Sequence, residues 1–405
     1  MPNPALLSAL ARSFLAGEPR VEGILARATS MLGTRHRWLK PLALRYVEEF
    51  GGETRPRRHD VIRFLSQDRL KFSVQRWVTA EAKMQPVPAA EAWDIPPLET
   101  VGALTDWLHL DPGQPEWFAD LRGIGHKHYY YRLLTKTDGS ARLIEAPKSG
   151  LKYLQRRILS RILEQIPPHP AVHGFIKGRS IKTFAAPHTG QRVVLRMDLK
   201  DFFPSLCAAR IQAFFRTVGY PEPVADLLGG FCTSSAPRAL CKLLPLHSQP
   251  HLPQGAPTSP ALANLCFWRM DCRLAGLART AGASYTRYAD DLAFSGGEAF
   301  ERCVNRFPIQ VAAILNEEGF RVNHRKTRIM RQGVRQHLAG LVVNDHINIR
   351  RADFDLLKAI LTNCVRRGPG GENRAHLEGR VGFVESINPV KGLRLRRIFD
   401  QIAWP

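Results

Sequence analysis

Two neighbouring carboxylates, Asp290 and Asp291, are the first candidates for chemistry in this chain. Apolar residues precede and follow them, a pattern typical of two strands joined at a hairpin tip. Adjacent negative charges are unfavourable unless a cation lies beside them. Mg²⁺, which prefers oxygen ligands, is the natural candidate for that cation. Taken alone, the pair is also compatible with an ordinary surface turn that carries two aspartates.

A third carboxylate, Asp198, follows the apolar run 193–197, which we expect to form a buried strand. A strand that ends in an aspartate presents its carboxylate at the edge of a sheet, where a hairpin tip can lie beside it. Such elements could hold two metal ions ~3.5–4 Å apart, the arrangement used for in-line phosphoryl transfer. One ion activates an attacking 3′-hydroxyl and the other steadies the leaving pyrophosphate. The sequence therefore predicts a nucleotidyl-transfer site.

Between these acidic segments lies a loop rich in proline and glycine, residues 252–260. Gly255 allows its backbone to approach a ligand closely. Ser259-Pro260 is a typical start of a helix. Loops of this composition are common, so the position of this one between the two acidic segments is what favours a functional role.

In this order the segments resemble the palm of reverse transcriptases. The matches are Asp198-x-x-x-x-Phe203, Leu252-Pro253-Gln254-Gly255-x-Pro257-x-Ser259-Pro260 and Tyr288-Ala289-Asp290-Asp291. Gly319-Phe320-x-x-Asn323-x-x-Lys326-Thr327 resembles the next palm motif, and 338–344 resembles the primer-grip hairpin, which implies that Gly340 contacts primer or template. Two upstream segments resemble motifs of the fingers: Lys136-x-Asp138-Gly139-x-x-Arg142-x-Ile144-x-x-Pro147 and His173-Gly174-Phe175-x-x-Gly178-Arg179-Ser180-Ile181. The resemblance covers roughly residues 120–345.

The resemblance implies a role in catalysis for five positions. Asp198 and Asp290 would be the principal ligands of two Mg²⁺ ions, with Asp291 assisting. The backbone carbonyl of Leu199 would contribute to the metal shell. Lys326 would be the general acid for the departing pyrophosphate. A solvent-facing lysine is the alternative at that position.

The same resemblance implies contacts with the incoming nucleotide and the primer. Lys136 and Arg142 would hold the triphosphate, because both side chains donate well to phosphate oxygens. Gln254 would line the nucleotide pocket. The ring of Phe203 would exclude a 2′-hydroxyl and favour dNTPs, with ordinary core packing as the alternative. Tyr288 would pack under the primer end.

The compact layout is most similar to bacterial retron reverse transcriptases, and the Arg- and Trp-rich leader resembles that of the longer myxobacterial type. Two motifs depart from the retron pattern: Phe184 replaces the Asn of N-A-x-x-H, and Leu338-Ala339-Gly340 replaces V-T-G. The resemblance implies a cognate structured RNA as template and primer, copied into DNA from dNTPs. Synthesis would begin at an internal guanosine 2′-hydroxyl and give branched RNA–DNA (msDNA). Anti-phage defence with a possible retron effector protein is implied as well.

Two other functions remain compatible with the sequence. The first is another bacterial reverse transcriptase, of an unclassified defence, group II intron or diversity-generating type. The second is an inactive RNA-binding scaffold on the same fold, although three clustered acids would have no purpose in a scaffold.

The elements that must position these residues form an α+β right hand: fingers, a palm with an antiparallel sheet, and an α-helical thumb. Residues 1–97 are predicted to be a helical, basic N-terminal extension and linker, 98–345 the fingers and palm, and 346–405 the thumb. Lys and Arg exceed Asp and Glu by 22, which favours a polyanionic partner such as RNA. Basic runs can also form a merely solvated face.

The remaining composition excludes several classes of protein. The seven cysteines include no C-x-x-C pair, which argues for reduced thiols in a cytosol and against a zinc site or disulfide framework. No signal peptide and no apolar run of ~18 residues is visible. We therefore expect a cytoplasmic bacterial protein with no membrane partner.

Overall fold

The computed structural model describes residues 4–15, 19–51, 56, 58–67, 84–111, 113–119, 125–135, 139 and 141–404. The chain divides into two compact units. The first unit comprises Met1–Pro167 and Phe203–Cys266, and the second comprises Pro168–Phe202 and Phe267–Pro405. This grouping does not test the three predicted domains, whose boundaries stay a prediction.

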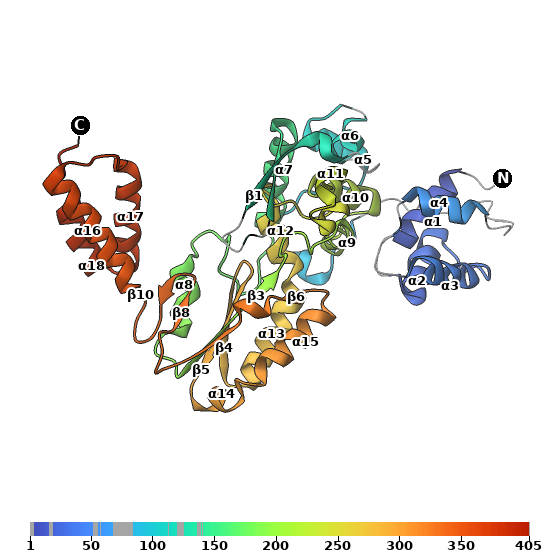
Figure 1. The fold of residues 1–405 in the computed structure, drawn as a ribbon. Coiled ribbons are helices and arrows are strands. Elements are labelled where there is room, and N and C mark those ends of the chain that lie inside the picture. Colours follow the sequence, from blue (N-terminus) through green and yellow to red (C-terminus); the bar gives the residue numbers. More distant parts are fainter. Residues whose placement is uncertain are drawn as a thin grey trace. The chain divides into compact units, whose positions relative to one another are not determined.

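The N-terminal part of the first unit is helical, as the spacing of its apolar residues predicts. The helices are α1 (Pro4–Leu15), α2 (Val21–Leu32), α3 (Leu39–Phe50) and α4 (Arg58–Gln67), drawn in blue in Figure 1. Leu10, Phe14 and Tyr46 are fully or almost fully buried in their shared core. Phe14 and Tyr46 meet edge to face with ring centroids 5.0 Å apart, a favourable geometry for aromatic pairs.

The rest of the first unit combines one hairpin with short helices. Strands β1 (Tyr129–Thr135) and β2 (Ala141–Pro147) pair antiparallel. The α-helices are α5 (Val101–Leu108), α6 (Gln114–Ala119), α7 (Ser149–Arg161), α9 (Ala208–Val218), α10 (Glu222–Phe231), α11 (Arg238–Cys241) and α12 (Ser259–Cys266). Single 3₁₀ turns are η1 (Pro88–Ala90), η2 (Gly125–His128), η3 (Leu163–Gln165) and η5 (Pro245–Ser248). Helix α12 begins at Ser259, where the sequence indicates a start.

The proline-rich segment 86–97 packs against other residues of the first unit. The amide of Gln85 donates to the carbonyl of Gly219 at 2.9 Å, and a side chain at Gly219 would lie 2.6 Å from the nitrogen of Pro86. The hydroxyl of Tyr220 donates to the carbonyl of Pro96 at 3.1 Å. These contacts pack both ends of the segment against Gly219 and Tyr220, which follow α9.

The second unit is built on an antiparallel sheet of order β4-β5-β3-β6, with β7 pairing β3 as well. The strands are β3 (Val193–Lys200), β4 (Ala283–Tyr288), β5 (Asp291–Gly296), β6 (Arg321–Val322) and β7 (Arg328–Arg331). Strand β3 has partners on both sides and is buried along most of its length. An unbroken apolar run is typical of such a strand.

Helices pack on both sides of this sheet. The helical elements are α8 (Ile181–Ala185), η4 (Ala186–His188), α13 (Trp268–Thr280), α14 (Glu298–Cys303), α15 (Phe307–Glu317) and η6 (His324–Lys326). Helices α13 and α15 lie beside the strands in Figure 1, and Phe307 of α15 contacts Phe294 of β5 with ring centroids 5.0 Å apart. His188 contacts the hydroxyl groups of Ser295 at 2.6 Å and Thr286 at 2.7 Å. The histidine of the modified N-A-x-x-H motif therefore ties η4 to the central hairpin.

The C-terminal part of the second unit is mainly helical. It comprises β8 (His337–Leu338), β9 (Leu341–Val342), β10 (Asn348–Ile349), α16 (Arg351–Arg367), α17 (Arg374–Ile387) and α18 (Pro389–Phe399). Leu361, Leu377 and Leu395, one from each long helix, are fully buried in one cluster. The helical thumb expected over 346–405 is consistent with these elements.

Among the described residues, no helix is both long enough and apolar enough to cross a membrane. All seven cysteines lie within the described ranges and carry free thiols.

Candidate active site

The register of two strands brings the predicted acids together. Asp198 of β3 is the direct partner of Asp291 of β5. Side chains of directly opposed residues in an antiparallel pair lie on the same face, with Cβ atoms ≈ 4.5–5.5 Å apart. Asp290 belongs to the turn that joins β4 to β5, since Tyr288 pairs with Asp291. Three carboxylates separated by up to 93 positions in sequence therefore meet at one end of the hairpin.

The strand is longer than expected beyond the first acid. Asp198 was predicted to end the strand, but β3 continues to Lys200 and pairs Leu199 with Val322 of β6. Asp198 is consequently 97% buried instead of lying at an open edge. The amide of Leu199 donates to the carbonyl of Asp290 at 2.9 Å, which fixes the turn against the strand.

The turn between β4 and β5 is conformationally demanding. Ala289 has φ 55°, a left-handed conformation that costs a residue with a side chain about 1–2 kcal/mol. Gly174 lies against this turn, and a Cβ there would be 2.6 Å from the nitrogen of Ala289. The glycine of the His173-Gly174-Phe175 motif is thus required by the close approach of two backbones.

A buried ion pair supports the turn between β4 and β5. Arg287 of β4 and Asp271 of α13 have side chains with no exposed surface. Arg287 donates through Nε to Oδ1 of Asp271 at 2.9 Å and through Nη2 to Oδ2 at 2.7 Å. Its remaining Nη1 lies 3.2 Å from the carbonyl oxygen of Ala289 and donates to it. The hydroxyl of Tyr285 donates to the same Asp271 at 2.8 Å.

The negative charge of Asp271 stabilises the charged form of Arg287. Burial by itself lowers the pKa of Arg287, but the attraction of Asp271 outweighs it and the net shift is upward. Arg287 therefore stays charged and keeps its hydrogen bonds at physiological pH.

The acids of the turn repel one another. Burial raises the pKa of Asp290, and the negative charges of Asp198 and Asp291 raise it further. Burial also raises the pKa of Asp291, although Arg196 opposes that shift. Elevated pKa values of neighbouring carboxylates indicate a site that gains stability from an added positive charge.

Two cations of the chain lie against these acids. Lys326 places Nζ 2.8 Å from Oδ2 of Asp198, while its side chain is 52% exposed. Arg196 donates to Oδ1 of Asp291 through Nε at 2.9 Å and Nη2 at 2.8 Å. Both cations are within the same compact unit as the acids.

The donor set fits a divalent cation of the Mg²⁺ type. Carboxylate and carbonyl oxygens are the ligands that such hard ions prefer. The raised pKa values of Asp290 and Asp291 mean that a cation would relieve repulsion at this place.

The predicted primer residues lie in the same unit. Tyr288 is half-buried, with its ring 5.8 Å from that of Phe184 and 6.4 Å from that of Phe175. Gly340 has φ 85° and Ala339 has φ 46° in the two-residue turn between β8 and β9. Positive φ at both central positions is the geometry for which glycine is favoured in tight hairpins.

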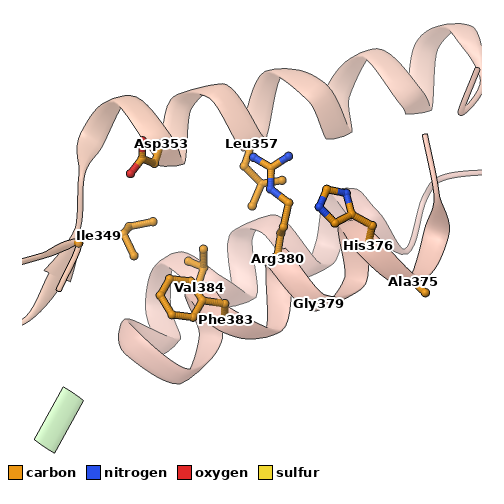
Figure 2. A pocket seen from close by; sticks show the side chains of 10 residues that line it. Ile349, Asp353, Leu357, Ala375, His376, Gly379, Arg380, Phe383 and Val384 are labelled. Atoms are coloured by element: carbon orange, nitrogen blue, oxygen red, sulfur yellow. The ribbon is translucent and has the colours of Figure 1, made fainter. Parts of the chain in front are cut away.

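A groove of about 440 Å³ opens beside this hairpin. Figure 2 shows side chains of α16 and α17 around it, with Arg380 and His376 on α17. Its lining residues are Gly340, Ile349, Asp353, Leu357, Ala375, His376, Gly379, Arg380, Phe383 and Val384. The groove is thus lined both by Gly340 of the β8–β9 turn and by residues of helices α16 and α17.

The predicted nucleotide residues belong to the other compact unit. Arg142 on β2 is exposed and pairs with Leu134 of β1. Gln254 is half-buried, and its carbonyl accepts a hydrogen bond from the amide of Glu145 at 2.8 Å. Phe203 is half-buried. Lys136 lies outside the described residues.

Sequence reasoning missed three residues that hold the acids in place. Arg196 precedes Asp198 by two positions, so the two-residue period of a strand puts both on one face. That alternation could have identified Arg196. Asp271 and Arg287 carry no comparable local signal, because their partnership depends on how α13 packs on β4.

Comparisons with known proteins identify relatives of this chain. Residues 134–345 match the family model described as reverse transcriptase (RNA-dependent DNA polymerase). The retron Mx65 reverse transcriptase of Myxococcus xanthus is 44% identical over 275 residues, which cover 67% of this chain and 64% of that protein. The retron Mx162 reverse transcriptase of the same organism is 38% identical over 337 residues, covering 75% of this chain and 69% of that protein.

A more distant relative comes from another organism. The retron Ec86 reverse transcriptase of Escherichia coli is 33% identical over 255 residues, covering 63% of this chain and 74% of that protein.

Proposed function

Because the chain belongs to the reverse transcriptase family, and within it to the retron type, we propose that it copies RNA into DNA at Asp198, Asp290 and Asp291. The observation that carries this proposal is the direct pairing of Asp198 with Asp291, with Asp290 in the adjoining turn. The expected right-hand α+β fold and the expected enzyme class agree with the family match over 134–345.

The three acids and the carbonyl of Leu199 are proposed to hold two Mg²⁺ ions. When bound, such ions lower the pKa of an attacking 3′-hydroxyl and stabilise the charge on a leaving pyrophosphate. The chain contributes orientation: Arg287 and the amide of Leu199 hold the turn, and Arg196 holds one oxygen of Asp291.

Lys326 is proposed to donate a proton to the departing pyrophosphate. It is half-exposed and held by Asp198 at 2.8 Å, so the same side chain is both anchored and accessible. Release from that carboxylate would let its Nζ turn toward a phosphate oxygen. A positioned acid of this kind typically contributes 10²–10⁴-fold to the rate.

The nucleotide pocket is proposed to include Lys136, Arg142, Gln254 and Phe203. The two cationic side chains would bind the triphosphate, Gln254 would line the pocket, and the ring of Phe203 would exclude a 2′-hydroxyl. Exposure of Arg142 on β2 leaves its guanidinium available to phosphate oxygens.

The primer–template duplex is proposed to lie along Tyr288, Gly340 and the groove of Figure 2. Arg380 and His376 line that groove, and the small residue Gly379 between them lets a strand approach the helix. We propose three functional domains for the chain. They are a helical N-terminal extension over 1–97, the fingers and palm over 98–345, and the thumb over 346–405.

Retron kinship supports a finer proposal about the substrate. The template is proposed to be a cognate structured RNA, primed from an RNA 2′-hydroxyl to give branched RNA–DNA. The net charge of +22 suits such a polyanion. Anti-phage defence and a retron effector protein as partner belong to the same proposal.

Primer extension tests the polymerase proposal. The chain is incubated with an RNA template, an annealed primer, dNTPs and Mg²⁺, beside the variants Asp290→Ala and Glu298→Ala, the second at an exposed acid of α14. Extension by the wild type and by Glu298→Ala, and none by Asp290→Ala, is the expected outcome. Equal and negligible incorporation by all three would favour an RNA-binding scaffold instead.

The retron proposal has its own test. Nucleic acid isolated from cells that express the chain with its neighbouring DNA is digested with a 2′,5′-debranching enzyme. Conversion of an RNA–DNA species to separate strands is expected. An unbranched product would instead assign the chain to another class of bacterial reverse transcriptase.

A further inference from the structure

Three potential metal ligands meet inside the first unit, in a place separate from the acids described above. They are Glu145 of β2, His247 of η5 and His251. Their exposed fractions are 0%, 8% and 1%. One ligand atom from each residue lies within 4.8 Å of the other two. A carboxylate and two imidazoles rarely gather away from water unless a positive charge joins them.

Hydrogen bonding fixes the tautomer of His251. Its Nδ1 lies 2.8 Å from the carbonyl oxygen of Gln249. A carbonyl can only accept, so Nδ1 carries the proton. The other nitrogen, Nε2, lies 2.7 Å from Oε2 of Glu145. Two lone pairs would face each other across this distance unless Nε2 also carried a proton or both atoms were ligands of one metal ion.

The second oxygen of Glu145 separates these two possibilities. Oε1 is buried and has no hydrogen-bond partner among the described residues. A proton on His251 would serve Oε2 alone and would leave Oε1 unsatisfied, which is rare for a buried polar atom. A metal ion can use either oxygen and can also reach His247, whose ring centroid is 4.7 Å from that of His251.

We propose that Glu145, His247 and His251 bind one transition-metal ion of the Zn²⁺ class. Two imidazoles and one carboxylate form a common ligand set for Zn²⁺, whereas Mg²⁺ and Ca²⁺ select oxygen ligands. The hydrogen bond from Nδ1 of His251 to a backbone carbonyl is the support that metal-bound histidines usually have.

This site departs from the expectation of no zinc centre, which rested on the absence of paired cysteines. The missed signal was the spacing His247-x-x-x-His251. Neither histidine belongs to any of the polymerase motifs. The third ligand lies 106 positions before His251, so no local pattern could include it.

The position of the ion indicates what it would do. The amide of Glu145 donates to the carbonyl of Gln254, and a Cβ at Gly255 would lie 2.9 Å from the carbonyl oxygen of Glu145. The ion would therefore fasten strand β2, which carries Arg142, to the loop that carries Gln254. This consequence for the nucleotide pocket rests on the proposed function, while the binding of the ion does not.

Metal titration of the full chain tests the site. Chelator-treated protein is titrated with Co²⁺, followed by its visible absorption, and then with Zn²⁺ in competition. The double variant Asp290→Asn/Asp291→Asn removes two carboxylates of the other cluster. We expect one tightly bound Co²⁺ in the wild type and in this double variant, with the intense bands of a four- or five-coordinate ion.

Single variants then locate the ion. Glu145→Gln and His251→Ala are expected to weaken Co²⁺ binding by at least about 100-fold. His346→Ala, at an exposed histidine, serves as the matched control and is expected to bind like the wild type. Circular dichroism of each variant reports whether it is folded.

Three results would overturn the proposal: no stoichiometric Co²⁺ binding by the wild type, binding unchanged in Glu145→Gln and His251→Ala, or loss of binding in the double variant. Should the single variants fail to fold, X-ray absorption of the Zn²⁺-loaded wild type decides. Imidazole scattering from two ligands supports the site, and oxygen-only coordination refutes it. Failure of primer extension leaves these readouts unaffected, so the two proposals fail independently.

Discussion

The buried pair of Arg287 and Asp271 offers a sharp test of how the acidic turn is held. Arg287 reaches the carbonyl of Ala289, next to Asp290, while Asp271 neutralises its charge from α13. The substitution Asp271→Ala removes that neutralisation and leaves the guanidinium inside the unit. The ring of Phe267, 5.1 Å away, provides only a weak substitute for a carboxylate.

The expected cost follows from the complete burial of both side chains. Removal of one partner of a buried ion pair costs about 3–5 kcal/mol, because the remaining charge has no compensation. At about 1.4 kcal/mol per factor of ten, the opening equilibrium of the hairpin should shift by about 10²- to 4 × 10³-fold. The double variant Asp271→Leu/Arg287→Met removes both charges and should recover part of this loss.

Hydrogen exchange measured by mass spectrometry resolves the effect by region. Peptides covering β4 and β5 should lose protection in Asp271→Ala, and primer extension should fall with them. The matched control is Asp353→Ala, which breaks an exposed pair with Arg350 at 2.7 Å. Exposed pairs contribute about 0.2–1 kcal/mol, so exchange in its surroundings should change little. If Asp271→Ala shifts the β4–β5 peptides by less than tenfold, the pair does not hold the turn and the reasoning is wrong.

Three further outcomes are expected. Phe203→Val should raise incorporation of ribonucleotides relative to deoxyribonucleotides in primer extension, and unchanged selectivity would remove its role as a gate. Lys326→Met should lower single-turnover incorporation by about 10²–10⁴-fold without weakening primer–template binding, with Lys326→Arg less affected; a parallel loss of binding would contradict a proton-donating role. Burial lowers the pKa of His188 to about 3, so only the unfolded chain takes up its proton as pH falls below about 6.5. The contribution of His188 to stability is therefore complete above that pH and should fall by about 2 kcal/mol at pH 5, whereas His188→Gln should show a flatter pH dependence in urea unfolding.

Local patterns were sufficient for the elements of the palm. The run 193–197 predicted β3, and the apolar flanks of Asp290 and Asp291 predicted the β4–β5 hairpin. Ser259-Pro260 predicted the start of α12. These features depend on residues a few positions apart, whose alternation or turn chemistry is visible in the chain itself. The family resemblance then implied that Asp198 lies beside Asp290 and Asp291. The β3–β5 register, which pairs Asp198 with Asp291, is consistent with that expectation.

The contacts that hold those acids needed the folded chain. Arg196 could have been found from the alternation along β3, but its partner Asp291 depends on the register of two strands joined by a long intervening segment. The pair of Asp271 and Arg287 depends on which face α13 turns toward β4.

The cluster of Glu145, His247 and His251 was the hardest feature to predict from the sequence, because Glu145 lies 106 positions before His251. Periodicity in a sequence reports which face of an element is buried, because each residue's preference for water is local. It does not report which other element covers that face, because that choice is made by the packing of the whole unit. The motifs were therefore readable along the chain, whereas the charges and ligands that support them emerged only when distant segments came together.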